Sequence, residues 1–137
     1  MVPLSRHRYT VLVVDDDPSV LSTYRRLLTR AGYRTLVEQD PVRVLEDRYE
    51  DRVPDLILLD YRMPGMDGLT LLANLRQREC SARCILLSAY LNDDVRTQAR
   101  LLGVDRVLEK PVDACTLREV IGELLPVTGP RAAGIAG

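Results

Sequence analysis

The stretch of residues 54–68, PDLILLDYRMPGMDG, decides the fold. Residues 55–59 are apolar after the initial aspartate, which predicts a strand buried on both faces. Asp60 follows this strand, MPG forms a turn, and Asp67 with Gly68 opens a helix behind an acidic N-cap. A strand that is apolar on both faces and leads into a helix is typical of a parallel sheet covered by helices.

The same alternation of a short apolar run and a helix-period segment occurs five times along the chain. Parallel strands joined by right-handed crossovers favour a doubly wound α/β sheet with helices on both faces. The expected strands are residues 9–14, 35–38, 55–59, 84–87 and 105–109. The expected helices start at Asp17-Pro18, at Pro41 (covering 42–49), at Asp67-Gly68, at Asn92 or Asp93 and at Asp113, with stops at Gly32 and Gly103.

Length and composition indicate one globular domain. The chain has 137 residues, of which 46% are hydrophobic and 28% charged, enough to bury a core without disulfides. We expect a lead-in over residues 1–8, the domain over 9–125 and a flexible tail or linker over 126–137, because that tail is rich in Pro, Gly and Ala and lacks periodicity.

Charge and composition exclude several classes of function. The net charge of −1 predicts no direct contact with nucleic acid. No apolar run suits a signal peptide or a membrane span, so we expect a cytoplasmic protein with no membrane contact. His7 is the only histidine, which argues against a Ser-His-Asp or zinc enzyme. The odd set Cys80, Cys84 and Cys115 predicts reduced, small, buried thiols.

Polar residues stand at the ends of four of the expected strands. In an open parallel sheet, ligands bind beyond the carboxyl ends of the strands. Each of these residues alone would more often be a cap or a solvated turn residue. Their coincidence at one edge predicts a site composed of Asp15, Asp16, Asp60, Ser88 and Lys110.

Three carboxylates at one edge require a cation. Two like charges about 4 Å apart repel by roughly 4 kcal/mol at an effective dielectric of 20. Oxygen ligands suit Mg²⁺ best, with Mn²⁺ as a substitute. Lys110 is the only lysine among 19 basic residues, which favours a specific need for an ammonium there. A divalent ion, a lysine and a hydroxyl around one carboxylate form a cradle for a phosphoryl group, with Asp60 as the nucleophile and an aspartyl phosphate as the product.

The runs VLVVDDDPS, DYRMPGMDG, LLSA and EKP resemble those of response regulator receiver domains, in the same order and spacing over about residues 9–125. The resemblance implies a flavodoxin-like (βα)5 three-layer sandwich with strand order 2-1-3-4-5. It also implies a role in bacterial two-component signalling. The phosphoryl group would come from a phosphohistidine of a sensor histidine kinase or phosphotransfer protein, and a conformational switch would control a downstream output domain or effector protein.

The resemblance also implies individual roles. Asp60 would accept the phosphoryl group, and the Lys110–Pro111 bond would be cis. The Mg²⁺ ligands would be Asp16, Asp60 and the backbone carbonyl of Arg62, with Asp15 bound to the ion mainly through water. The phosphoryl oxygens would be bound by Ser88, the Ala89 amide and Lys110.

The chain departs from the family pattern at the switch position. Similar domains carry Tyr or Phe three residues before the lysine, where this chain has Val107, and it has no Phe or Trp. Either a smaller packing change transmits the signal, which we expect, or Tyr90 takes part. Arg62 and Tyr90 flank the expected path of the hydrolytic water; they either slow self-dephosphorylation or only cover the surface.

Three functions compete. The first is a phosphorylation switch that catalyses its own phosphorylation and dephosphorylation and is not a turnover enzyme. The second is an aspartyl-nucleophile phosphatase, which needs a second Asp where this chain has Arg62 and a cap insertion for which there is no room. The third is a binding module that no longer uses phosphate, disfavoured because all five site residues are present. The surface of the fourth helix, fifth strand and fifth helix is the default docking face by resemblance. Charged residues on it could make salt bridges to a partner: Arg96, Arg100, Arg106, Arg118 and Glu119. Phosphorylation-dependent homodimerisation is left open.

Overall fold

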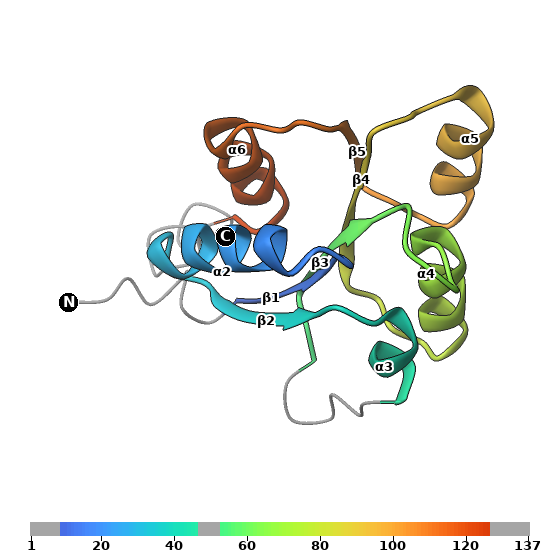
Figure 1. Cartoon of the computed structure of the whole chain (residues 1–137), viewed down its shortest axis with the longest axis horizontal. Helices are drawn as coiled ribbons and strands as arrows, with labels where there is room; N and C mark the ends of the chain where they lie inside the picture. The colour runs from blue at the N-terminus through green and yellow to red at the C-terminus, as the bar shows by residue number, and fades with distance from the viewer. Residues whose placement is uncertain (1–8, 47–52, 127–137) are drawn as a thin grey trace, which may run out of the picture.

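The computed structural model describes residues 9–46 and 53–126. Within these ranges strands and helices alternate as the sequence predicts (Figure 1). The strands are β1 (Thr10–Val14), β2 (Arg34–Glu38), β3 (Leu56–Asp60), β4 (Arg83–Ser88) and β5 (Arg106–Glu109). The helices are α2 (Pro18–Arg30), α3 (Pro41–Glu46), α4 (Gly68–Gln77), α5 (Asp93–Leu101) and α6 (Ala114–Leu124).

The five strands form one parallel sheet in the order β2-β1-β3-β4-β5. The predicted fold and strand order are therefore confirmed. The order reverses between β1 and β3, where Val14 pairs with Leu59. Ligand sites of doubly wound sheets lie beside such a reversal, beyond the carboxyl ends of the strands.

Helices cover both faces of the sheet (Figure 1). On one face, α2 and α6 pack against Val11, Val13 and Leu58. On the other face, α3, α4 and α5 pack against Leu12, Ile57 and Leu86. The three inner strands are buried almost throughout, which is why their sequences are continuous apolar runs. No helix in residues 9–46 or 53–126 is long and apolar enough to cross a membrane.

Side-chain caps define most helix starts. Asp17, Asp67 and Asp113 each accept a hydrogen bond from a backbone N–H in the first turn, as predicted. Asn92, and not Asp93, caps α5 by accepting from the Val95 N–H at 2.8 Å. The stops at Gly32 and Gly103 are confirmed, because both adopt positive φ just beyond a helix end.

Several sequence predictions need correction, and others concern residues outside 9–46 and 53–126. β3 extends one residue further than predicted, so Asp60 is its last residue and not the first of the loop. α3 begins at Pro41, and the part of the predicted helix beyond residue 46 lies outside the described residues, as do residues 1–8 and 127–137. Only Cys84 is a buried thiol, and burial raises its pKa to about 12. The prediction was wrong for Cys115, which is exposed, and for Cys80, which is half-buried.

Arg76, near the end of α4, donates to four loop carbonyls that the sequence did not connect, including that of Gly103 at 3.4 Å from Nη2. Its Nη1 donates to the carbonyls of Cys80 (2.9 Å) and Ala82 (2.7 Å), and its Nε donates to the carbonyl of Leu102 at 3.2 Å. These carbonyls lie at the amino edge of the sheet, before β4 and after α5.

We expect Arg76→Met to lower the free energy of unfolding by about 2 kcal/mol, because hydrogen bonds from a charged donor are lost and the freed carbonyls are only partly rehydrated. Urea unfolding measures the change, and Arg25→Met, on the exposed side of α2, is the matched control. Equal midpoints for the two variants would contradict a stabilising role for Arg76.

Candidate functional site

Three aspartates meet at the carboxyl edge of the sheet. Asp15 and Asp16 follow β1, and Asp60 ends β3, the strand that pairs with β1. One carboxylate oxygen from each lies within 4.8 Å of the other two. Asp15 and Asp60 are buried, with exposed fractions of 2% and 6%, whereas Asp16 is exposed. The site is therefore a half-open acidic cluster.

Lys110 brings a positive charge to this cluster from the end of β5. Its Nζ lies 2.8 Å from Asp60 Oδ1 and 3.3 Å from Asp15 Oδ2. The Lys110 N–H also donates to the carbonyl of Ser88 at 2.8 Å, which fixes the lysine backbone against β4. The Lys110–Pro111 bond is cis, as expected.

Burial and charge set the ionisation of the pair. Burial raises the pKa of Asp60, the hydrogen bond from Lys110 opposes this, and the nearby charge of Asp15 adds to the rise. Burial lowers the pKa of Lys110, but the hydrogen bond to Asp60 and the charge of Asp15 outweigh it, so the lysine pKa is raised. The lysine is thus held as an ammonium beside carboxylates whose charges still repel one another.

Ser88, at the end of β4, is hydrogen-bonded to the loop that follows it. Its Oγ donates to the carbonyl of Tyr90 at 3.0 Å and accepts from the Tyr90 N–H at 3.2 Å. Ser88 is only 1% exposed, so these local bonds satisfy a buried hydroxyl. Ala89, the next residue, is exposed at the end of β4.

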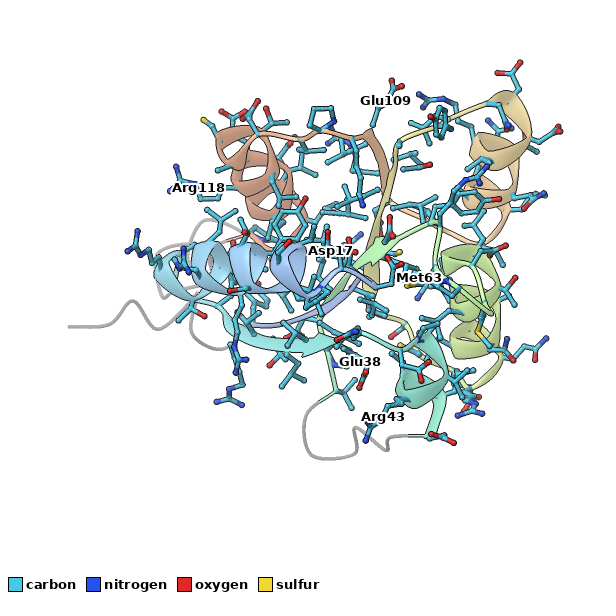
Figure 2. All side chains as sticks on the ribbon, in the orientation of Figure 1. Asp17, Glu38, Arg43, Met63, Glu109 and Arg118 are labelled. Atoms are coloured by element: carbon cyan, nitrogen blue, oxygen red, sulfur yellow. The ribbon has the colours of Figure 1, made fainter. Side chains whose placement is uncertain are left out.

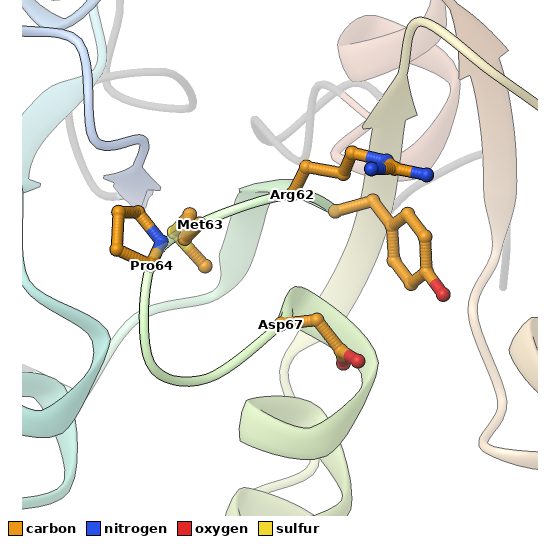
Figure 3. A pocket seen from close by; sticks show the side chains of 5 residues that line it. Arg62, Met63, Pro64 and Asp67 are labelled. Atoms are coloured by element: carbon orange, nitrogen blue, oxygen red, sulfur yellow. The ribbon is translucent and has the colours of Figure 1, made fainter.

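Arg62 and Tyr90 contact each other from the loops that follow β3 and β4. The Arg62 guanidinium carbon lies 5.8 Å from the centroid of the Tyr90 ring, a cation–π distance. Tyr90 is 71% exposed, so the pair covers the surface without entering the core. Arg62 also borders a hollow of about 430 Å³ together with Tyr61, Met63, Pro64 and Asp67 (Figure 3, which does not include Tyr90).

Gly68 is a site residue whose importance the sequence reasoning missed. A Cβ at this position would lie 2.4 Å from the carbonyl oxygen of Asp60 and 3.0 Å from the Leu59 side chain. The Gly68 N–H donates to the carbonyl of Tyr61 at 2.8 Å. The start of α4 is therefore packed directly on the backbone of the acidic strand. The glycine in DYRMPGMDG was the available signal, but its spatial neighbour is visible only in the fold.

The position expected to hold an aromatic switch contains a small aliphatic residue. Val107 is half-buried on β5 and packs with the cluster that includes Leu91, Leu102 and Val104. Tyr90 lies outside this cluster, and in the described residues it contacts Arg62 instead.

The donor set suits a hard divalent cation. The cluster offers three carboxylate oxygens from Asp15, Asp16 and Asp60, and Mg²⁺ prefers oxygen ligands while keeping several waters. The exposure of Asp16 leaves the site open to water and ligand. A cation here would also relieve the repulsion that contributes to the raised Asp60 pKa. The residues present therefore fit Mg²⁺, as they would Mn²⁺.

Comparison with known proteins gives one consistent result. The family model described as "Response regulator receiver domain" matches residues 11–122. Sporulation initiation phosphotransferase F of Bacillus subtilis is 29% identical over 117 residues, which are 85% of this chain and 94% of that protein. The DNA-binding transcriptional regulator NtrC of Escherichia coli is 38% identical over 106 residues, which are 77% of this chain but only 22% of that protein.

Among solved structures, a CheY-like response regulator receiver domain protein from Methanospirillum hungatei superposes with a TM-score of 0.79 at 26% identity. The match covers 85% of this chain and 93% of that one. The fold and the acidic cluster define a doubly wound α/β signalling module. The chain belongs to the response regulator receiver domain family, the receivers of two-component signal transduction.

Proposed function

We propose that Asp60 is the residue that accepts the phosphoryl group, in a reaction that depends on Mg²⁺. The observation that carries the proposal is the arrangement around Asp60, whose carboxylate is buried, paired with Lys110 at 2.8 Å and clustered with Asp15 and Asp16. In the transfer, an Asp60 oxygen would form a bond to phosphorus while the bond to the donor's leaving group breaks. The product is an aspartyl phosphate.

Each neighbour would have a defined part. Asp15, Asp16, Asp60 and the backbone carbonyl of Arg62 would hold Mg²⁺, which supplies positive charge to the phosphoryl oxygens when bound. Lys110 would leave its carboxylate partners to pair with a phosphoryl oxygen. Ser88 would release the Tyr90 carbonyl, 3.0 Å away, and donate to another phosphoryl oxygen, together with the Ala89 N–H.

Loss of the hydrogen bond from Ser88 to the Tyr90 carbonyl would link phosphorylation of Asp60 to a change elsewhere in the domain. The loop from Ala89 to Asn92 joins Ser88 to the cap of α5. We expect Leu91, within this loop, to repack against Val107 after phosphorylation, in place of an aromatic rotation. This small packing change would control an output domain or effector protein. We propose a cytoplasmic switch that is phosphorylated by a sensor histidine kinase or phosphotransfer protein, spans residues 9–125 and is not a turnover enzyme.

Phosphorylation is tested by incubating the protein with acetyl phosphate and measuring its intact mass with and without Mg²⁺. We expect one added phosphoryl group with Mg²⁺ and none with EDTA, because without the cation the acidic cluster repels the incoming anion. Borohydride reduction and peptide mapping should locate the adduct at Asp60. An adduct at another residue, or one that forms equally well in EDTA, would contradict the proposal.

Arg62 and Tyr90 are expected to lengthen the lifetime of the phosphate, because both flank the expected path of the hydrolytic water and they contact each other. Arg62→Ala should speed the loss of the adduct severalfold once the donor is removed, and Arg96→Ala, on the exposed side of α5, is the control. The decay of the adduct by mass spectrometry measures both. Equal decay rates of the adduct in Arg62→Ala and Arg96→Ala would show that Arg62 and Tyr90 cover the surface without affecting hydrolysis.

A further inference from the structure

A hollow lies between α2 and α6, on the face of the sheet opposite α4 and α5. Its volume is about 520 Å³, and its rim carries Arg30 on α2 together with Arg118 and Glu119 on α6. Leu125 and the buried Tyr33 line its floor. The two helices lie on the same side of the sheet in Figure 1, and Arg118 projects outward from α6 in Figure 2.

The exposed face of α6 has the spacing of a helix-packing surface. Cys115, Arg118, Glu119 and Gly122 are three, four and seven residues apart, so they share one side of the helix. All four are exposed, whereas the opposite side of α6 is buried in the core through Leu117, Val120 and Ile121. In the described part of the chain, nothing packs over this exposed face.

Nothing in residues 9–46 or 53–126 packs against the position of Gly122 in a way that requires a glycine. It lies inside α6 with an ordinary helical φ, and a Cβ built on it would meet no atom within 4 Å. A glycine inside a helix costs about 0.5–1 kcal/mol relative to alanine. The open space above Gly122 therefore marks a place where another backbone or side chain can approach α6 closely.

The charges on this face are self-complementary. Arg118 and Glu119 are adjacent on α6, and neither forms an ion pair in residues 9–46 or 53–126. Glu119 Oε1 accepts from the Cys115 thiol at 3.7 Å, which leaves its second oxygen for a partner. A neighbouring pair of opposite charges matches its own copy when that copy is turned by a two-fold rotation, because each charge then faces the opposite one. No partner of a single charge sign satisfies both residues at once.

We propose that the α6 face composed of Cys115, Arg118, Glu119 and Gly122 is a two-fold interface with a second copy of this chain. The two α6 helices pack antiparallel, with the axis between residues 118 and 119. Arg118 then faces Glu119 of the second copy, and Cys115 faces Gly122 of the second copy, where the missing Cβ leaves room for the thiol. The sequence placed Arg118 and Glu119 on the α5–β5–α6 docking surface expected from the family resemblance. In the structure they line the hollow beside α2 instead, and the proposed interface does not depend on phosphoryl transfer.

The test is the concentration-dependent mass of the whole chain by analytical ultracentrifugation, up to millimolar protein and without phosphoryl donor. Arg118→Glu and Glu119→Arg should each weaken the dimer about tenfold or more, because each brings two pairs of like charges together. A mixture of these two variants should form a heterodimer, since the two acidic side chains of one variant then face the two basic side chains of the other. The double exchange Arg118→Glu/Glu119→Arg should restore the homodimer. Arg100→Glu, on α5, is the control and should leave the dimer unchanged.

Gly122→Ala provides an independent measurement. We expect it to weaken the dimer while stabilising the dilute monomer, because the added methyl fills the space needed by the second copy but favours the helix. A wild-type chain that stays monomeric up to millimolar concentration would overturn the proposal. So would a dimer that is insensitive to both single charge reversals, or one that the double exchange fails to restore.

Discussion

Replacing Asp60 with asparagine is expected to abolish the phosphoryl adduct completely. The amide has nearly the size of the carboxylate but is a poor nucleophile and carries no negative charge for a cation. Asp60→Asn should also lose most of the stabilisation that Mg²⁺ gives to the wild-type fold, because one of three clustered carboxylates is gone. At a Mg²⁺ concentration ten times the dissociation constant, that stabilisation would be about 1.4 kcal/mol in the wild type.

Intact mass after acetyl phosphate treatment measures the first effect, and the shift of the thermal midpoint with Mg²⁺ measures the second. Asp94→Asn, which removes an exposed carboxylate on α5, leaves the net charge equal to that of Asp60→Asn and serves as the control. A phosphoryl adduct on Asp60→Asn at the wild-type level would show that another residue is the acceptor. An unchanged midpoint shift would show that the cation binds without Asp60.

The sequence predicted the parts of the molecule that depend on local pattern. Continuous apolar runs identified the inner strands, and aspartates followed by helix-period segments identified the caps at Asp17, Asp67 and Asp113. The convergence of Asp15, Asp16, Asp60 and Lys110 was predictable for a similar reason. Parallel strands place their carboxyl ends at one edge of the sheet, so the residues at these ends lie close together regardless of the loop conformations.

The features that the sequence did not predict depend on contacts between distant segments. Arg76 looked like one of many surface arginines, yet it donates to carbonyls in two separate loops. Asp55 and Asp105 were expected only as the first residues of two strands, but each side chain accepts a backbone hydrogen bond at the start of a neighbouring strand, from Thr10 and Cys84 respectively. These hydrogen bonds can be foreseen only when the register of neighbouring strands is known. A strand that is apolar throughout does not specify its register by its own sequence.

The exposed and buried cysteines illustrate the same limit. Composition favoured three similar buried thiols, but only Cys84 lies on a buried strand. Cys115 lies on α6, where the helix period places residues 117, 120 and 121 inward and leaves residue 115 outward. Applying the 3.6-residue period to the last helix would have separated these cases, whereas residue type alone did not.

Gly68→Ala is expected to destabilise the fold by about 3 kcal/mol, a large effect for a single added methyl group. The new Cβ would lie 2.4 Å from the carbonyl oxygen of Asp60, and backbone cannot move aside as a flexible side chain would. The gain in helix propensity offsets at most about 1 kcal/mol of this cost. Because the Gly68 N–H is also bonded to the Tyr61 carbonyl, relief of the clash must displace α4 or the end of β3.

Such a displacement would move the Asp60 carboxylate relative to Asp15 and Lys110. We therefore expect the rate of phosphorylation by acetyl phosphate to fall at least tenfold in Gly68→Ala molecules that remain folded, because small misplacements of reacting groups cost large factors in rate. Urea unfolding and the initial rate of adduct formation measure the two effects. Gly122→Ala at low protein concentration is the matched control, since its Cβ meets nothing within 4 Å and should stabilise the monomer. If both glycine variants unfolded at the same urea concentration, α4 would not be packed on the backbone of Asp60, and the rigid coupling of this helix to the site would be wrong.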